Sequence, residues 1–172
     1  MDEMDALTAR MTAEAGYVQY EVSNYAKTGK ACRHNMVYWE CLPYLGVGLN
    51  AHSDMDGRRF YNPENWEVYL MMAESDDINR IQEGKNSREE RMFERMMMGL
   101  RQTQGVDRAR FAQDFGAEPE RIWPKTICEM TDKELMTCNK ERIALTGRGM
   151  QVMNGVLVRL MEEMDSKPQT DV

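Results

Sequence analysis

The residue types with the greatest chemical capacity lie together in HNMVYW, residues 34–39. Within six positions this segment carries an imidazole, a carboxamide, a phenol and an indole, from His34, Asn35, Tyr38 and Trp39. A neutral imidazole can ligate a metal ion, and aromatic rings can stack on a flat ligand. The histidine and the asparagine can equally bond to nearby backbone groups and fix the local chain. The residues alone leave a binding role and a structural role both open.

A glycine-spaced apolar segment, YLGVGLNA at 44–51, follows this motif. Its leucines and valine alternate with glycine, which predicts a buried strand. A glycine inside a strand marks a place where a ligand or another backbone comes close, so Gly48 is a candidate pocket residue. His52, the second of only two histidines, follows the predicted strand. It can either face a binding site or anchor the fold.

A third group of polar side chains lies in YVQYEVSN, residues 17–24, whose alternation of apolar and polar residues predicts a half-buried strand. Glu21, Ser23 and Asn24 lie on this strand, whose side chains alternate between its two faces. A carboxylate in a protein interior needs a partner or a ligand. A glutamate on an exposed strand face needs neither, and the sequence does not decide between the two.

These segments resemble the C-terminal half of the HemW-type radical-SAM proteins, relatives of oxygen-independent coproporphyrinogen III oxidase. The resemblance extends from about Gly16 to Glu162 through six motifs: YEVSNYA, RHNMVYW, YLGVGLNAHS, RRFYN, MMMGLRQTQGVD and IALTGRGMQVMN. The HNxxYW and AHS elements are more similar to the HemW branch of haem chaperones than to the true oxidases. The resemblance implies that HNxxYW contacts haem, with His34 as a candidate ligand of the haem iron. It also implies that side chains of a strand such as 17–24 line the interior of a barrel, as candidates for lining a pocket: Glu21, Ser23 and Asn24.

The cysteines do not supply the cluster-binding loop of this family. They lie at positions 32, 41, 128 and 138, and no three have the CxxxCxxC spacing that holds a [4Fe–4S] cluster. The resemblance implies a [4Fe–4S] cluster and S-adenosylmethionine for the full-length family, bound by an N-terminal half that we expect to be missing here. We therefore expect no catalytic residues in this chain and no radical-SAM activity from the chain alone.

The composition narrows the classes of partner. Charged residues make up 30% of the chain and the formal net charge is −7, so nucleic acid meets a repelling average field. No apolar run approaches the length of a membrane span, and no signal peptide opens the sequence. We therefore expect a cytoplasmic protein.

The remaining patterns in the first half predict helices and one hairpin. Residues 4–15 are expected to form a helix that ends at Gly16, and Asp56-Gly57 is a hairpin turn signal. Asn62, followed by a proline, predicts the start of another helix. Ser87 with Glu90 has the pattern of a capping box before a helix. The apolar face of that helix is expected to consist of Met92, Phe93, Met96, Met97 and Leu100.

The second half has a winged-helix-like order of elements. Helices are predicted from Asp107 and from Pro119, with a kink or break at Pro124. The segments KELMT and ERIALT predict a β-hairpin, and Thr146 can cap a last helix. This order matches the small C-terminal domain of the resembled family.

The fold class we predict is α/β, or α+β within this chain. We expect the C-terminal part of an incomplete (β/α) radical-SAM barrel at 1–75, a connecting helical segment at 76–106, a winged-helix-like HemN C-terminal domain at 107–163 and a polar tail at 164–172.

The function that the resemblance implies is that of a HemW-like haem chaperone or coproporphyrinogen-oxidase-like protein of porphyrin metabolism. Haem or porphyrin would be the ligand, and the missing barrel half or a haem-acceptor protein would be the protein partner. Two alternatives remain open: a piece of a true oxygen-independent coproporphyrinogen III dehydrogenase, and a non-enzymatic protein-interaction or DNA-binding module. Nucleic acid is disfavoured by the interleaved acidic residues around the predicted wing, such as Glu134 and Glu141.

Overall fold

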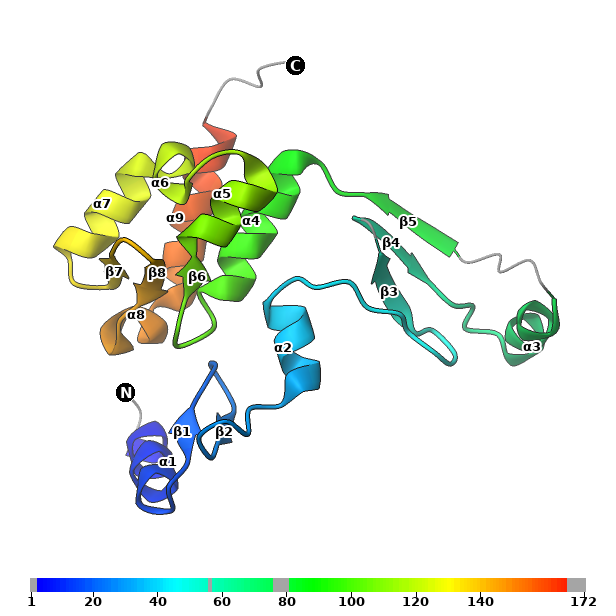
Figure 1. Cartoon of the computed structure of the whole chain (residues 1–172), viewed down its shortest axis with the longest axis horizontal. Helices are drawn as coiled ribbons and strands as arrows, with labels where there is room; N and C mark the ends of the chain where they lie inside the picture. Colours follow the sequence, from blue (N-terminus) through cyan, green and yellow to red (C-terminus); the bar gives the residue numbers. More distant parts are fainter. Residues whose placement is uncertain (1–2, 56, 76–80, 167–172) are drawn as a thin grey trace.

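The computed structural model describes residues 3–55, 57–75 and 81–166. Figure 1 shows a helical body, formed by the chain from α4 onward, and an arm formed by the earlier elements, which extends below the body and to its right. The two parts differ in how much of their apolar surface is buried.

The helical body begins at α4 (Arg88–Gly99), and the predicted capping box is confirmed at its first turn. The Ser87 hydroxyl accepts a hydrogen bond from the Glu90 backbone N–H at 3.1 Å, and the Glu90 carboxylate accepts one from the Ser87 N–H at 2.7 Å. These two bonds satisfy backbone donors that the helix itself leaves free. Met92 and Met96 on the predicted apolar face are almost fully buried.

The break predicted at Pro124 is also confirmed. It separates α6 (Pro119–Ile122) from α7 (Pro124–Asp132), because proline cannot donate the backbone hydrogen bond that would continue the helix. Trp123 between them is fully buried, and its indole Nε1 donates a hydrogen bond to the Leu160 carbonyl at 2.9 Å. The break therefore places a large aromatic side chain in the core and fixes it against the last long helix.

A small antiparallel sheet completes the body, with strand order β6-β8-β7. The predicted hairpin is confirmed as β7 (Met136–Cys138) and β8 (Arg142–Leu145). The other elements are β6 (Val106–Asp107), α5 (Arg108–Phe115), α8 (Gly147–Gln151) and α9 (Met153–Asp165). Thr146 accepts a hydrogen bond from the Gly149 N–H, as expected of a cap. Among the described residues, every fully buried apolar side chain lies between Met92 and Leu160, so the hydrophobic core belongs to the body alone.

The arm contains short elements joined by long connections. Its helices are α1 (Glu3–Glu14), α2 (Arg33–Trp39) and α3 (Trp66–Glu74). Its strands are β1 (Val18–Gln19), β2 (Tyr25–Ala26), β3 (His52–Met55), β4 (Arg58–Tyr61) and β5 (Ile81–Lys85). The predicted hairpin forms between β3 and β4, with Gly57 at a φ of 71°, while Asp56 lies outside the described residues. The sequence patterns did not indicate β5, which pairs antiparallel with β4.

Two strand predictions in the arm are wrong in extent. Residues 44–51 form no strand, because Gly48 and Asn50 take positive φ values of 106° and 51° that an extended chain cannot hold. Only an isolated bridge joins Tyr44 to Asp54. In 17–24 the strand shrinks to Val18–Gln19. Alternation alone predicts a strand only when a neighbouring strand pairs with it, and in the described chain these segments lack such neighbours on most of their length.

The helix cap predicted at Asn62 is also wrong. Asn62 is buried and donates to the carbonyl oxygens of Gly46 and Gly48, at 3.3 and 2.8 Å. Asn65 caps α3 instead, by accepting a hydrogen bond from the Val68 N–H at 3.0 Å. The Asn62 amide therefore binds the backbone of the glycine segment and does not cap a helix.

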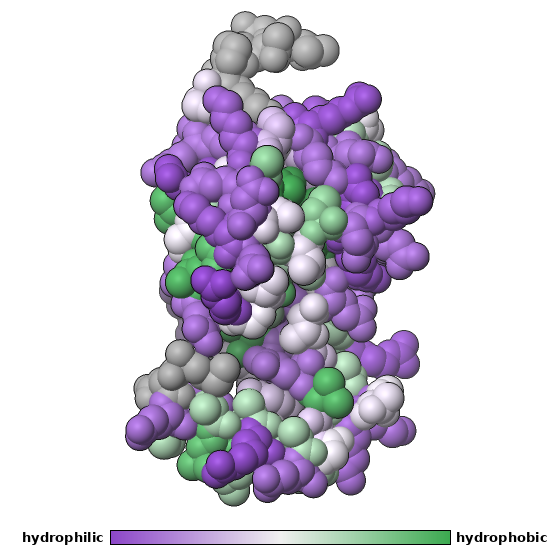
Figure 2. All heavy atoms as spheres, turned by 90° about the vertical axis from the view of Figure 1, so that its left-hand side faces the viewer, coloured by the Kyte–Doolittle hydropathy of each residue, from purple (hydrophilic) through white to green (hydrophobic). Residues whose placement is uncertain are grey.

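Apolar side chains of the arm remain exposed. In α1, Met4 and Met11 keep 68% and 59% of their surface accessible, and Val47 keeps 82%. Figure 2 shows that hydrophilic side chains cover most of the helical body on one face, with hydrophobic patches toward the end of the molecule where α1 lies. The described residues form no closed barrel, and none of their helices is long and apolar enough to cross a membrane.

Candidate functional site

The HNMVYW motif forms a short helix, α2, which presents His34 to solvent. Tyr38 lies one turn further along the same face, because side chains four positions apart are neighbours on a helix. The Tyr38 hydroxyl and the His34 Nε2 atom are 3.2 Å apart, and the two rings meet edge to face with centroids 5.0 Å apart. The imidazole is thus accessible and oriented by a phenol.

The aromatic surface continues from α2 to the segment after it. The rings of Tyr38 and Tyr44 pack edge to face, with centroids 4.8 Å apart. Burial raises the pKa of the Tyr44 phenol, and the nearby Arg59 guanidinium opposes this shift. His34, Tyr38 and Tyr44 therefore form a continuous row of rings, which we call the aromatic row.

Asn35 and Trp39 connect α2 to the rest of the protein. The Asn35 amide donates to the Tyr20 hydroxyl at 3.3 Å, and the Trp39 carbonyl accepts a hydrogen bond from the Gln102 side chain at 3.0 Å. Trp39 is half-buried, and its indole Nε1 has no hydrogen-bond partner among the described residues. Of the four motif residues predicted to contact a ligand, only His34 is exposed. Tyr38 is half-buried, as are Asn35 and Trp39, which attach the helix to its surroundings.

The three polar candidates from residues 17–24 do not come together. Glu21 is fully buried, its Oε2 accepts a hydrogen bond from the Ser23 N–H at 3.2 Å, and its Oε1 has no partner within the described chain. Its backbone forms a bridge with Gln102. Ser23 and Asn24 are exposed in the following turn. Gln102 therefore links both Glu21 and Trp39 to the end of α4.

Gly48 and His52 lie on the hairpin side of the arm. A Cβ atom at Gly48 would meet nothing within 4 Å, so its positive φ rather than a close approach favours glycine there. The close approach occurs at Gly46, where a Cβ would lie 2.2 Å from the His52 carbonyl oxygen. His52 stacks on Tyr61, its partner on β4, at 5.2 Å between centroids.

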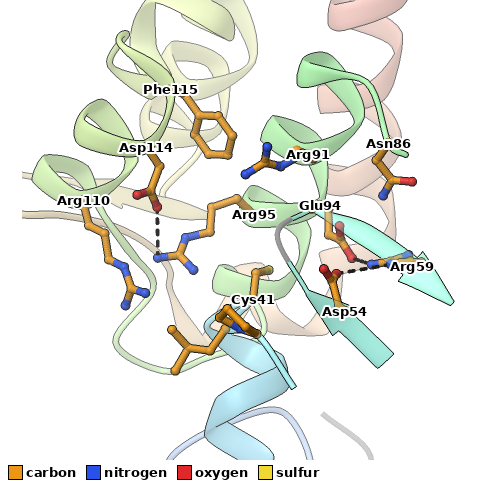
Figure 3. Close-up of a pocket in the computed structure, with 13 residues that line it drawn as sticks. Cys41, Asp54, Arg59, Asn86, Arg91, Glu94, Arg95, Arg110, Asp114 and Phe115 are labelled. Atoms are coloured by element: carbon orange, nitrogen blue, oxygen red, sulfur yellow. Dashed lines mark hydrogen bonds and ion pairs between the residues drawn. The ribbon is translucent and has the colours of Figure 1, made fainter. Parts of the chain in front are cut away.

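A cavity of about 510 Å³ lies where the arm meets the body. Figure 3 shows it enclosed by the connection after α2, the β3–β4 hairpin, α4 and α5. Its charged lining residues are Asp54, Arg59, Arg91, Glu94, Arg95, Arg110 and Asp114. Sequence reasoning missed this site, although Arg91 and Arg95 stand one helical turn apart and could have indicated a basic face on α4.

On the hairpin side of the cavity, one arginine pairs with two carboxylates. Arg59 contacts Asp54 at 3.4 Å and forms a second, closer ion pair with Glu94. These two carboxylates raise the pKa of the Arg59 guanidinium against the opposing effect of its desolvation. Cys41, at the base of the cavity, has a thiol whose pKa burial raises to about 11, with a further contribution from Glu94. Its sulfur is therefore a protonated thiol near neutral pH.

The donor sets in the chain fit haem better than an iron–sulfur cluster. An exposed histidine beside aromatic rings is a suitable axial ligand for haem iron. A cluster needs several thiolates in one place. Three of the four cysteines are exposed, the fourth, Cys138, bonds to Glu120, and no group of three or more metal-ligating side chains occurs in the described residues. The chain itself does not supply a cluster site.

Three comparisons place this chain among known proteins. The HemN C-terminal domain family matches residues 86–152. The haem chaperone HemW of Bacillus subtilis (strain 168) is 30% identical over 149 residues, which cover 87% of this chain and 39% of that protein. The haem chaperone HemW of Synechocystis sp. is 42% identical over 112 residues, or 63% of this chain and 27% of that protein.

A solved structure shares the fold. The coproporphyrinogen III oxidase (HemN) of Escherichia coli, described as a radical-SAM enzyme, superposes with a TM-score of 0.64 at 13% identity. The match covers 90% of this chain and 39% of the other. The chain therefore spans well under half the length of the relatives it matches.

Proposed function

Because the chain belongs to the HemW/HemN family and corresponds to its C-terminal portion, we propose that it binds haem on α2 as part of a haem chaperone. Bound haem supplies an iron atom that accepts an axial ligand. The exposed imidazole of His34 provides that ligand, and Tyr38 orients the ring through its contact at 3.2 Å.

The observation that carries this proposal is the accessibility of His34 beside the aromatic row. A histidine with a structural role would be expected to bond into the fold, as Asn35 does through Tyr20. Within the described chain, the side-chain hydrogen bond and the ring contact of His34 are both with Tyr38, on its own helix. Tyr38 and Tyr44 add ring surface on which a flat macrocycle can pack.

The finer architecture is part of the same proposal. The helices and antiparallel hairpin of residues 107–163 have the order of a winged-helix-like domain, and α4 within 76–106 connects it to the arm. Residues 1–75 would belong to the barrel of the full-length family. A [4Fe–4S] cluster and S-adenosylmethionine would then be bound outside this chain, and the missing barrel half or a haem-acceptor protein would cover exposed side chains such as Val47 and Met71.

Titration with haemin tests the haem site. We expect the wild-type chain to give a shifted Soret band, and His34→Ala to weaken the spectral change by about tenfold or more in apparent Kd, because an axial ligand is lost. His52→Ala is the matched control, since it removes the other histidine and should leave the spectrum unchanged. A Soret titration that is the same for wild type and His34→Ala would remove His34 from the site.

A further inference from the structure

Charged side chains of both signs line the cavity between the arm and the body. Figure 3 shows Asp54, Glu94 and Arg59 grouped on the hairpin side, whereas Arg91, Arg95 and Arg110 approach from α4 and α5. We call these last three the arginine wall. Asp54 and Glu94 both pair with Arg59, and the carboxylate that lies within the wall, Asp114, is 3.9 Å from Arg95.

Arg91 has the most available charge in the arginine wall. Among the described residues it has no carboxylate partner. Its guanidinium lies 6.0 Å from the centroid of the Phe115 ring, a cation–π distance that holds the side chain over the cavity. The N–H donors of a guanidinium lie in its own plane, so a guanidinium that stacks on an aromatic ring can still donate them to a planar anion.

Within the described chain, Arg95 has only a long ion pair, whereas Arg110 has a direct one. The Arg95 side chain keeps 10% of its surface exposed, and its one ion pair, with Asp114, is long at 3.9 Å. It also donates a hydrogen bond to the Glu40 carbonyl oxygen. Arg110 contacts the Glu40 carboxylate at 3.2 Å. A buried guanidinium without a close anion is costly, so the wall is suited to an incoming carboxylate.

The aromatic row connects α2 to this cavity. Tyr44 contacts Tyr38 on one side, and on the other its phenol is close enough to Arg59, Asp54 and Glu94 for their charges to act on it. The cavity volume of about 510 Å³ is within the usual range for small-molecule sites. The row therefore ends beside the charged residues on the hairpin side of the cavity.

We propose that the arginine wall binds the propionate carboxylates of the porphyrin whose iron His34 ligates. This inference rests on the proposed haem-binding function and adds the residues that recognise the acidic edge of the ligand. Arg91 supplies a guanidinium that has no ion pair among the described residues, Arg95 a buried donor and Phe115 an apolar side against which the substituent packs. The predicted consequence is a preference for porphyrins with free carboxylates.

Haemin and its dimethyl ester, titrated under the same solvent conditions, test this preference. The ester keeps the iron and the macrocycle but carries no negative charge on its side chains. We expect the wild-type chain to bind haemin about tenfold more tightly than the ester, because a charge-assisted hydrogen bond is lost. Arg91→Ala should weaken haemin binding by about tenfold and leave ester binding unchanged. The affinity of Arg91→Lys for haemin should lie between those of the wild type and Arg91→Ala, because lysine keeps the positive charge and loses the planar guanidinium.

Arg148→Ala is the matched control for charge. Arg148 is an exposed arginine paired with Glu134 on the body, and it does not line the cavity. Its loss should leave the haemin-to-ester ratio of the wild type unchanged. Thermal unfolding of each variant checks that Arg91→Ala, which breaks no ion pair among the described residues, keeps the fold.

The outcomes separate the two proposals. If the wild-type chain binds neither haemin nor its ester, both the haem function and the wall are wrong. If haemin binds and depends on His34, but binding is indifferent to Arg91 and to esterification, only the wall is wrong. If Arg91→Ala weakens haemin alone while His34→Ala has no effect, the wall is supported and the axial role of His34 fails.

Discussion

At the scale of single residues, Cys41 shows how the cavity changes side-chain chemistry. It takes a positive φ of 48°, which is uncommon for a residue with a side chain, and lies at the base of the cavity. Burial is the largest cause of its raised pKa, followed by the charge of Glu94, while Arg95 acts in the opposite direction. The fold therefore favours the neutral thiol over the thiolate.

We predict that Cys41 resists alkylation in the folded chain at pH 8. Because its pKa is about 11, its thiolate fraction, and with it the rate with iodoacetamide, should rise about tenfold per pH unit up to that value. The stability that the neutral thiol contributes is fully present below its unfolded pKa, near 9, and is lost as the pH rises through 11.

Peptide mapping by mass spectrometry at several pH values measures this rate. Cys32 is the internal reference in the same digest; because both cysteines have exposed surface, slower labelling of Cys41 reports its raised pKa and not a lack of access. Equal labelling of Cys41 in the folded chain and in urea at pH 8 would contradict a desolvated thiol.

The candidate site was only partly predictable at this scale. The residue types of HNMVYW indicated ring stacking and ligation, and a helix brings His34 and Tyr38 to one face. The sequence could not show that Asn35 and Trp39 bond to Tyr20 and Gln102, because those partners are distant along the chain. The arginine wall was missed for the same reason. Arg110 comes from a different helix, and only the packing of α4 on α5 brings it beside Arg95.

At the scale of elements, sequence patterns predicted helix starts and breaks best where the interacting residues lie within a few positions of one another. The capping box at Ser87 and the break at Pro124 depend on residues within a few positions, and both are confirmed. The strand predicted at 44–51 needed a neighbouring strand that the described chain does not pair with it. Alternating apolar and polar residues can therefore indicate which side chains share a face of the chain without showing that the segment pairs in a sheet.

The turn that leads into β6 gives an element-scale prediction. Gly105 has a φ of 70°, and a Cβ there would lie 2.1 Å from the Ile143 carbonyl oxygen on β8. Gly116, which ends α5, has a similar φ of 66° but open space around its Cβ position. Gly116→Ala should cost about 1–2 kcal/mol of unfolding free energy from backbone strain alone. Gly105→Ala should cost about 1–3 kcal/mol more, because β6 and β8 must also move apart.

Urea denaturation of the two variants measures the difference, with the shared backbone strain as the internal control. Gly105→Ala should also loosen the pairing of Val106 with Ile143, which hydrogen exchange can follow at those amides. Equal losses of stability in the two variants would mean that the turn tolerates the extra carbon and that the strand contact is not tight.

At the scale of the whole molecule, apolar burial is concentrated in the second half. The core cluster draws on α4, α5, α7 and α9 and on the strands of the β6-β8-β7 sheet, and it includes Trp123 and Phe111 with no exposed surface. In the described arm, by contrast, Val47 and Met71 keep 82% and 72% of their surface exposed. Burying one such side chain contributes about 1.5–3 kcal/mol, against a typical total of about 5–15 kcal/mol for a domain.

We therefore predict that limited proteolysis of this chain divides it near the start of α4. The segment before residue 86 holds few buried apolar contacts and should open locally at low free-energy cost, so a protease should remove it first. The segment from about 86 to 166 contains the core and should survive as a protected fragment, identified by mass spectrometry.

Size-exclusion chromatography should also show concentration-dependent association of the intact chain that the protected fragment lacks, since exposed apolar surface and unpaired strand edges favour contact between copies. A chain that stays monomeric and resists the protease uniformly along its length would show that the arm is stabilised by contacts other than apolar burial.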